Sequence, residues 1–244
     1  MSRHADRLRY LLLQARRPED PMREQERTCF QKGLNCHPTQ LDAWDLVHQE
    51  TGHPRWTDYD VILLGGSGYY SVVAGGPWLE RVQETIQELY ERAIPTFASC
   101  WGFQLISKAL GGSVITNLDQ AEIGTVDLKL TEAGQSDPLF GGLPTCFQAQ
   151  MGHQDIVTSL PPGAILLAST EQVHHEAFCF PAKGWYCTQF HPELTLADLV
   201  ERFTEYPEYV ERIAGIPLAE FMPRCRETPQ ANALLARFVD QLVA

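Results

Sequence analysis

The sequence has no long apolar run, no cysteine pair spaced as CxxC, no internal repeat and no low-complexity segment. A helix that crosses a bilayer needs about 20 consecutive apolar residues, and no stretch of this chain approaches that length. The opening segment, MSRHADRLRYLLLQARR, has too short an apolar part and no small-residue cleavage site for export. We therefore expect a cytoplasmic protein.

Positive charge is also scarce, with 19 Lys and Arg against 31 Asp and Glu and a formal net charge of -12. This balance leaves no basic face for phosphates, so nucleic acid and anionic membranes are not expected as partners. The seven cysteines are odd in number and lack CxxC spacing, which argues against a disulfide framework or a zinc site. With 244 residues, 44% of them hydrophobic, the chain can bury a full core as one domain over residues 1–244.

Short aliphatic runs alternate with longer helical patterns, which predicts an α/β fold. We expect strands at residues 9–14, 59–64 and 94–98, and helices at 19–32, 77–92 and 103–110, the first helix ending at Gly33. Six further short strands are expected between residues 112 and 190. Two or three helices should follow Glu193, punctuated by prolines at positions 207, 217, 223 and 229, so that a core at about 8–194 carries a helical extension at 195–244.

Cys100 lies in the turn between a predicted strand and a predicted helix, within the sequence ASCWG. At such an elbow a nucleophile projects from the sheet beside a helix N-terminus, where backbone N–H groups stabilise a thiolate or an oxyanion. Ala98 and Gly102 are the small neighbours that a crowded elbow needs. The alternative is a buried structural cysteine, and the elbow alone does not decide between the two.

His191 and Glu193 flank Pro192, which favours an extended backbone for the residue before it. Two residues apart on an extended chain, the side chains lie on one side, and a carboxylate there can orient an imidazole that takes a proton from a thiol. The alternative is two ordinary polar residues in a loop. By contrast, the adjacent His174 and His175 should point in opposite directions, so they do not indicate a metal site.

The glycine turn GGSG at residues 65–68 follows a predicted buried strand and can point backbone N–H groups at a ligand. Alone it is a weak signal, and it matches neither GxGxxG nor a P-loop, so no nucleotide site is inferred.

Four blocks taken together resemble the class I (triad) glutamine amidotransferases. They are YDVILLGGSG at 59–68, PTFASCWGFQLISKALGG at 95–112, GHQDIVTSLPPGAILLAS at 152–169 and TQFHPE at 188–193. They occur in the family's order, and the resemblance covers most of residues 8–194. It implies a flavodoxin-like open mixed sheet with helices on both faces, and no metal or organic cofactor.

The resemblance also implies roles. Cys100 would attack the γ-carboxamide of glutamine to form a γ-glutamyl thioester, His191 would move the protons, and Glu193 would orient His191. Backbone N–H groups of Gly66 and Trp101 would form the oxyanion hole.

The amino-acid end of the substrate would be held by Gln104 and by the main chain around Gly152, His153 and Gln154. The chain departs from the family at Ala98, Ser99 and Phe103 and in the loop after Gly66.

Two catalytic functions and one non-catalytic function remain open. The chain lacks an ammonia-accepting domain, so it is either a glutaminase that passes ammonia to a separate synthase chain, similar to the glutamine amidotransferase domain of GMP synthase, or a stand-alone γ-glutamyl peptidase. A binding module without turnover is less favoured, because Cys100, His191 and Glu193 are all present.

Overall fold

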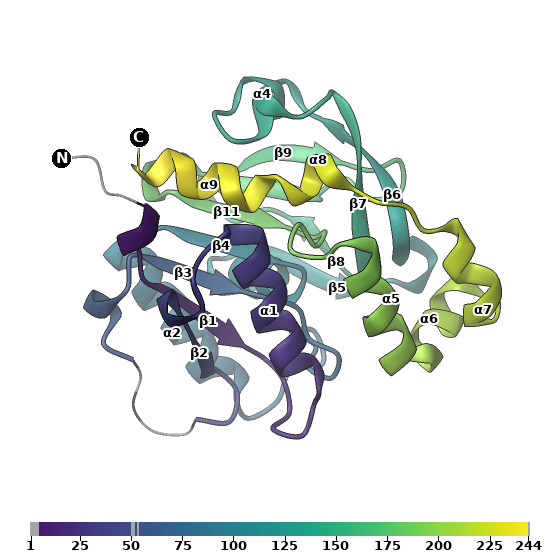
Figure 1. The fold of residues 1–244 in the computed structure, drawn as a ribbon, viewed down its shortest axis with the longest axis horizontal. Helices are drawn as coiled ribbons and strands as arrows, with labels where there is room; N and C mark the ends of the chain where they lie inside the picture. Colours follow the sequence, from purple (N-terminus) through teal and green to yellow (C-terminus); the bar gives the residue numbers. More distant parts are fainter. Residues whose placement is uncertain (1–4, 50–51, 53, 244) are drawn as a thin grey trace.

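The fold is built around a nine-stranded mixed sheet in the order β2-β1-β3-β4-β11-β10-β9-β6-β7. The computed structural model describes residues 5–49, 52 and 54–243 (Figure 1). The first five strands of this order run parallel, and every later pair is antiparallel. Strands β5 and β8 form a separate antiparallel pair.

The strands are β1 (Tyr10–Gln14), β2 (Leu41–Asp45), β3 (Val61–Leu64), β4 (Thr96–Ser99), β5 (Ser113–Thr116), β6 (Glu122–Leu130), β7 (Cys146–His153), β8 (Asp155–Ser159), β9 (Ile165–Ser169), β10 (Ala177–Phe180) and β11 (Trp185–Thr188). The α-helices are α1 (Met22–Leu34), α2 (Leu79–Arg92), α3 (Trp101–Ala109), α4 (Glu132–Ser136), α5 (Leu196–Glu205), α6 (Pro207–Ala214), α7 (Leu218–Phe221), α8 (Pro229–Asn232) and α9 (Leu234–Val243). Within the described residues, no helix is long and apolar enough to cross a bilayer.

Helices cover both faces of the sheet, as predicted. Successive side chains of a strand point to opposite faces, and in β1 Tyr10 and Leu12 join the core beneath α1 and α9, whereas Leu11 and Leu13 join the core beneath α2 and α3. Every residue of β1, β3 and β4 is buried, because both faces are covered. This is why these strands are continuous apolar runs that sequence patterns can find.

One expectation is wrong, and two strands were not predicted. Gly33 does not end α1; the helix continues to Leu34, and Asn35 supplies the left-handed cap with φ 52°. Gly33 instead permits close packing, since a Cβ there would lie 2.7 Å from Leu235 Cδ1 on α9. Strand β2, an edge strand with exposed or half-exposed central residues, was not predicted because it lacks an apolar run. Strand β10, four residues long, was missed as well.

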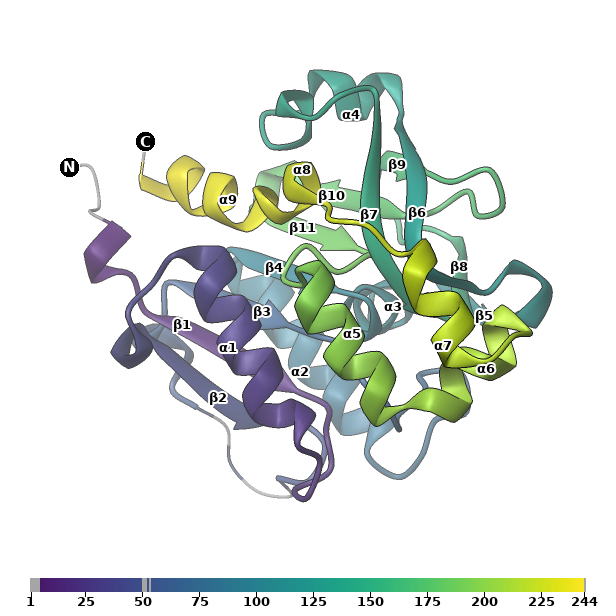
Figure 2. The ribbon, with the colours of Figure 1, turned by 45° about the vertical axis from the view of Figure 1, so that its right-hand side comes forward.

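Over its described residues, 195–243, the C-terminal extension contains five α-helices where two or three helices were expected. Pro207 and Pro229 are the first residues of α6 and α8, so they begin helices instead of separating them. Helix α8 contributes Ala231 to the main core, and α9 contributes Leu234, Leu235 and Phe238. Helices α5 to α7 pack in a smaller cluster of their own and gather at the end of the molecule away from the termini (Figures 1 and 2).

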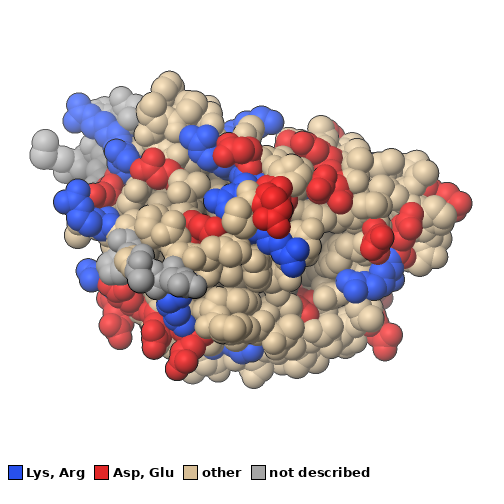
Figure 3. Space-filling model, turned by 90° about the horizontal axis from the view of Figure 1, so that it is seen from below, with Lys and Arg blue, Asp and Glu red and all other residues tan. Residues whose placement is uncertain are grey.

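Acidic and basic side chains are interspersed on the face seen in Figure 3, and no continuous basic band crosses it. The distribution of charge on that face agrees with the expectation, drawn from the net charge of -12, that the protein has no basic face for phosphates.

Candidate active site

Cys100 occupies the sharp turn between β4 and α3, with φ 51° and ψ -104°. A non-glycine residue at positive φ is uncommon and marks a constrained position. The turn leaves no room for larger neighbours: a Cβ on Gly102 would lie 2.5 Å from Leu64 Cβ and 3.2 Å from Ala98 Cβ. The structure therefore has the elbow that the sequence predicted, and the small residues serve the steric purpose expected of them.

His191 and Glu193 come to Cys100 from the neighbouring strand. Strand β11 pairs in parallel with β4, so both chains leave the sheet at the same edge, and Cys100 N donates a hydrogen bond to Thr188 O (2.8 Å). His191 Nδ1 lies 2.6 Å from Glu193 Oε1, and both side chains are buried. The structure thus places the three predicted catalytic side chains together.

The charges of this group favour an imidazolium. Burial disfavours the charged ring, but the Glu193 carboxylate and the ionised Cys100 outweigh burial and raise the pKa of His191 to about 9. Burial also acts to raise the pKa of Glu193, yet His191 and Arg202 hold it below its usual value. At neutral pH a protonated His191 therefore lies beside the thiol, as thiolate chemistry requires.

Arg202, which sequence patterns did not single out, is part of this group. Its Nη1 lies 3.6 Å from Glu193 Oε1, and its Nε donates to Gln25 Oε1 (2.8 Å). Nη1 is also 3.4 Å from His191 Nδ1, but Nδ1 carries the proton given to Glu193, so we treat this approach as a contact and not a hydrogen bond. Arg202 links α5 to the His-Glu pair.

The two backbone groups predicted for the oxyanion hole differ in their surroundings. Trp101 is the first residue of α3, where backbone N–H groups have no acceptor within the helix. The Gly66 N–H, however, donates to Glu26 Oε1 (3.0 Å), a buried carboxylate that also pairs with Arg16. In this structure Gly66 therefore does not offer a free donor, and its peptide would have to turn before it could bind an oxyanion.

The residues predicted to hold the amino-acid end lie on one side of Cys100. Gln104 Nε2 donates to Asp155 O (3.0 Å) and Gln189 Oε1 (3.2 Å), which leaves Gln104 Oε1 as the atom available to a substrate ammonium group. Gly152 O lies 3.7 Å from Cys100 Sγ. Gln154 Oε1 accepts from Arg212 Nη2 (2.7 Å), so α6 reaches this side too.

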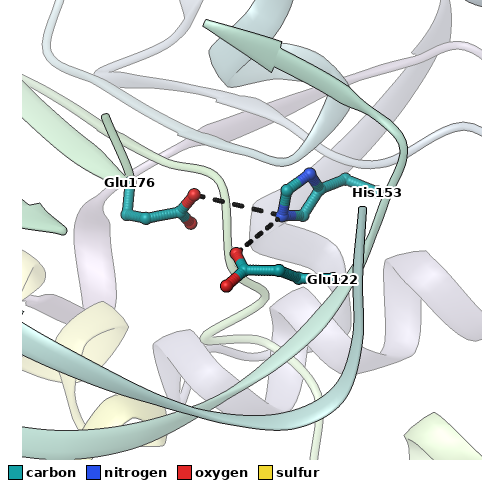
Figure 4. A group of neighbouring side chains, drawn as sticks. All are labelled: Glu122, His153 and Glu176. Carbon is teal, nitrogen blue, oxygen red and sulfur yellow. Dashed lines mark hydrogen bonds and ion pairs between the residues drawn. The ribbon is translucent and has the colours of Figure 1, made fainter. Parts of the chain in front are cut away.

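The His153 side chain belongs to a different group, a buried cluster with Glu122 and Glu176 (Figure 4). Its Nδ1 faces Asp155 O (3.2 Å), and its Nε2 lies 3.2 Å from Glu122 Oε2 and 4.0 Å from Glu176 Oε1. These donor types suit a divalent cation, since one ligand atom from each falls within 4.8 Å of the others. A shared proton also accounts for the cluster: burial and the Glu122 carboxylate hold the pKa of Glu176 well above its usual value. The absence of a metal remains a prediction.

Two cavities meet at Cys100. The Gln104 cavity, about 420 Å³ including its mouth, is bordered by Gln104 and by residues 67–71 and 152–155. The His191 cavity, about 650 Å³ including its mouth, is bordered by His191, Leu194 and side chains of α5 and α6. Cys100, Gly152 and Tyr209 of α6 border both. The extension is thus a wall of the site, a role that its sequence did not indicate.

An open α/β sheet with a cysteine at a strand-to-helix elbow and a His-Glu pair just after the neighbouring parallel strand defines a class of α/β proteins with a cysteine-histidine-glutamate site. The chain belongs to the class I glutamine amidotransferase family, whose sequence model (Glutamine amidotransferase class-I) matches residues 28–204.

Among curated proteins, the chain is similar to GMP synthase [glutamine-hydrolyzing] of Xanthomonas axonopodis pv. citri, with 33% identity over 147 residues, 57% of this chain and 27% of that protein. It is similar to the protein of the same name from Streptomyces avermitilis, with 37% identity over 157 residues, 64% of this chain and 27% of that protein. The chain therefore spans about a quarter of the length of these relatives.

Solved structures agree on the fold. A glutamine amidotransferase from Thermotoga maritima superposes with a TM-score of 0.74 at 22% identity, covering 96% of this chain and 98% of that one. A glutamine amidotransferase from Methylobacillus flagellatus superposes with a TM-score of 0.71 at 19% identity, covering 97% of this chain and 95% of that one. The predicted family and fold class are confirmed.

Proposed function

We propose that the chain hydrolyses the γ-carboxamide of glutamine, with Cys100 as nucleophile, His191 as acid and base, and Glu193 as the group that orients His191. The thiolate attacks the γ-carbonyl carbon, the C–N bond breaks as His191 protonates the departing ammonia, and a γ-glutamyl thioester remains. Water, deprotonated by His191, then releases glutamate and restores the thiol.

The observation that carries this proposal is the placement of Cys100 and the buried His191–Glu193 pair at the ends of adjacent parallel strands. The Trp101 N–H at the start of α3 supports the oxyanion, and Gly66 joins it once its peptide leaves Glu26. Gln104 and the main chain at residues 152–154 hold the amino-acid end.

The curated relatives are named GMP synthases, and the chain matches only 27% of the length of each of those described above. One role for the chain is therefore that of a glutaminase that hands ammonia to a separate synthase chain. The alternative is hydrolysis of a γ-glutamyl bond to a larger amine, which the His191 cavity favours because α5 and α6 border it beside the nucleophile.

The test is release of glutamate from glutamine and from a γ-glutamyl dipeptide by the purified full chain, with and without cell extract. Stimulation of glutamine turnover by the extract indicates a partner. Cys100→Ala should lower the rate at least about 10⁴-fold, because removal of the nucleophile leaves only binding and oxyanion stabilisation.

Cys146→Ala is the matched control, since Cys146 is an exposed thiol on β7 outside both cavities. It should retain wild-type activity. Equal activity in the Cys100→Ala protein would refute the proposal.

A further inference from the structure

The buried cluster of Glu122, His153 and Glu176 lies against the Gln104 cavity, and the proposed reaction does not use its side chains (Figure 4). His153 borders that cavity, whereas neither glutamate does. Glu176 is fully buried, and Glu122 and His153 are only 6% and 2% exposed. Three titratable side chains removed from water in this way must satisfy one another, because solvent cannot.

The contacts of His153 locate two of the protons in the cluster. Its Nδ1 faces Asp155 O (3.2 Å), and a carbonyl oxygen only accepts, so Nδ1 carries a hydrogen. Its Nε2 lies 3.2 Å from Glu122 Oε2. Two lone pairs cannot bind each other at that distance, so a second proton lies between these atoms. His153 and Glu122 therefore form a hydrogen-bonded pair.

Glu176 is left without a donor. Among the described residues, neither of its carboxyl oxygens has a hydrogen-bond partner, and His153 Nε2, at 4.0 Å, is beyond hydrogen-bond distance. Burial, the Glu122 carboxylate and Cys100 all raise the pKa of Glu176 well above its usual value. A protonated Glu176 becomes a donor itself, and Glu122 is the acceptor within its reach.

A metal ion accounts for this geometry less well than a proton. The cluster offers three ligand atoms, whereas a structural zinc site holds four. Water would have to supply the fourth ligand, but both oxygens of Glu176 are closed to solvent, and Glu122 and Glu176 border neither of the two cavities at Cys100. The cluster therefore favours a shared proton.

The cluster contacts both groups that orient Gln104. Asp155 O accepts from Gln104 Nε2 (3.0 Å) and faces His153 Nδ1 (3.2 Å). The second acceptor of Gln104 Nε2 is Gln189 Oε1 (3.2 Å), and the Gln189 backbone N–H donates to Glu176 O (2.8 Å). The cluster thus fixes the amide that leaves Gln104 Oε1 free for the substrate.

We propose that Glu176 is a neutral carboxylic acid that donates a hydrogen bond to the carboxylate of Glu122. These two residues hold His153 against Asp155 O, and so position Gln104 for the amino-acid end of glutamine. The inference rests on the proposed function and deepens it, because it adds Glu122 and Glu176 as positioning residues that do not touch the substrate.

Infrared spectroscopy of the full chain at neutral pH tests the protonation state without turnover. The wild-type spectrum should contain the C=O stretching band of a protonated carboxylic acid, and the Glu176→Gln spectrum should lack it. Glu132→Gln is the matched control and should keep the band, since Glu132 is an exposed glutamate on α4 outside both cavities.

Steady-state kinetics with glutamine test the positioning role. Glu176→Gln keeps a neutral donor of the same shape, so kcat and KM should stay within about twofold of wild type. Glu176→Leu removes the donor and should raise KM about fivefold with kcat little changed, the effect of one hydrogen bond. In a Gln104→Leu background, Glu176→Leu should raise KM no further, because the residue it positions is gone.

Three results would overturn the inference and leave the proposed function intact. They are a missing infrared band in wild type, a rise in KM for Glu176→Gln as large as for Glu176→Leu, and a full fivefold rise in the Gln104→Leu background. One equivalent of a divalent cation in wild type that Glu176→Gln lacks, measured by elemental analysis, would overturn it too. Absence of glutamine hydrolysis by the wild-type chain would overturn the proposed function and the positioning role together.

Discussion

The two sides of Cys100 are built from different parts of the chain. The Gln104 cavity is formed largely by loops at strand ends within residues 28–204, the part that matches the family. The His191 cavity takes its outer wall from α5 and from α6, and α6 lies entirely beyond residue 204. We therefore expect changes in the family's sheet to affect the reaction itself, and changes in the extension to affect the choice of leaving group.

After Cys100→Ala, Glu193→Gln should give the largest effect, and it should lower the turnover of substrates with small and large leaving groups alike. Burial lowers the pKa of His191, but the Glu193 carboxylate, the largest of the opposing interactions, acts together with Cys100 to raise it from 6.5 to about 9. Without the carboxylate the pKa of His191 falls, so the imidazolium is lost at a lower pH and the basic limb of the kcat/KM profile moves down. We expect a loss of about 10²- to 10⁴-fold at neutral pH for glutamine and γ-glutamyl-leucine together. A loss of activity confined to one substrate would show that Glu193 does not act on a step common to both substrates.

Phe238→Ala tests whether α9 serves stability alone, in contrast to α5 and α6, which border the His191 cavity. Phe238 lies on α9 in the main core, against Phe97 and Tyr186, and borders neither cavity. Truncation should lower the free energy of unfolding by about 3–5 kcal/mol, measured by urea denaturation. The kinetic constants of the remaining folded protein should match wild type. A change below 1 kcal/mol would show that α9 is not part of the core.

Gln104→Leu tests the glutamyl side alone. The substitution keeps the volume but removes the acceptor offered to the substrate and the donor to Asp155 and Gln189. We expect kcat/KM to fall about tenfold for every γ-glutamyl substrate, with their ratio unchanged. A ratio that shifts by more than a few-fold would mean that Gln104 contacts the leaving group.

Arg212→Ala should have the smallest effect. The Arg212–Gln154 hydrogen bond joins α6 to the glutamyl side but is exposed, so its loss should change kcat/KM by about two- to fivefold. A loss above 100-fold would assign Arg212 a direct role with the substrate.

Local features of the site could be predicted from the sequence. The elbow depends on small residues within two positions of Cys100. The pairing of His191 with Glu193 was also predicted, but from an extended backbone, whereas Pro192 and Glu193 lie in a turn in which the Leu194 N–H donates to His191 O (3.3 Å). The buried central strands were found because both faces of the sheet are covered. The family resemblance supplied the roles of these residues and of Gln104.

Long-range features could not be predicted in this way. Glu26 accepts a hydrogen bond from the Gly66 N–H, which lies 40 positions away in the sequence. Arg202 contacts Glu193 from α5, a helix whose sequence shows only an amphipathic pattern. A glycine is needed at position 33 because Leu235 packs closely against it, and not because the helix ends there. These contacts arise from packing between distant segments, which periodicity does not encode.

The most direct test of the account is mass spectrometry of the enzyme quenched during turnover of glutamine. We expect one γ-glutamyl group in thioester linkage on the peptide that contains Cys100, and none in the Cys100→Ala protein. An adduct on another of the seven cysteines, or turnover of glutamine by Cys100→Ala at the wild-type rate, would contradict it.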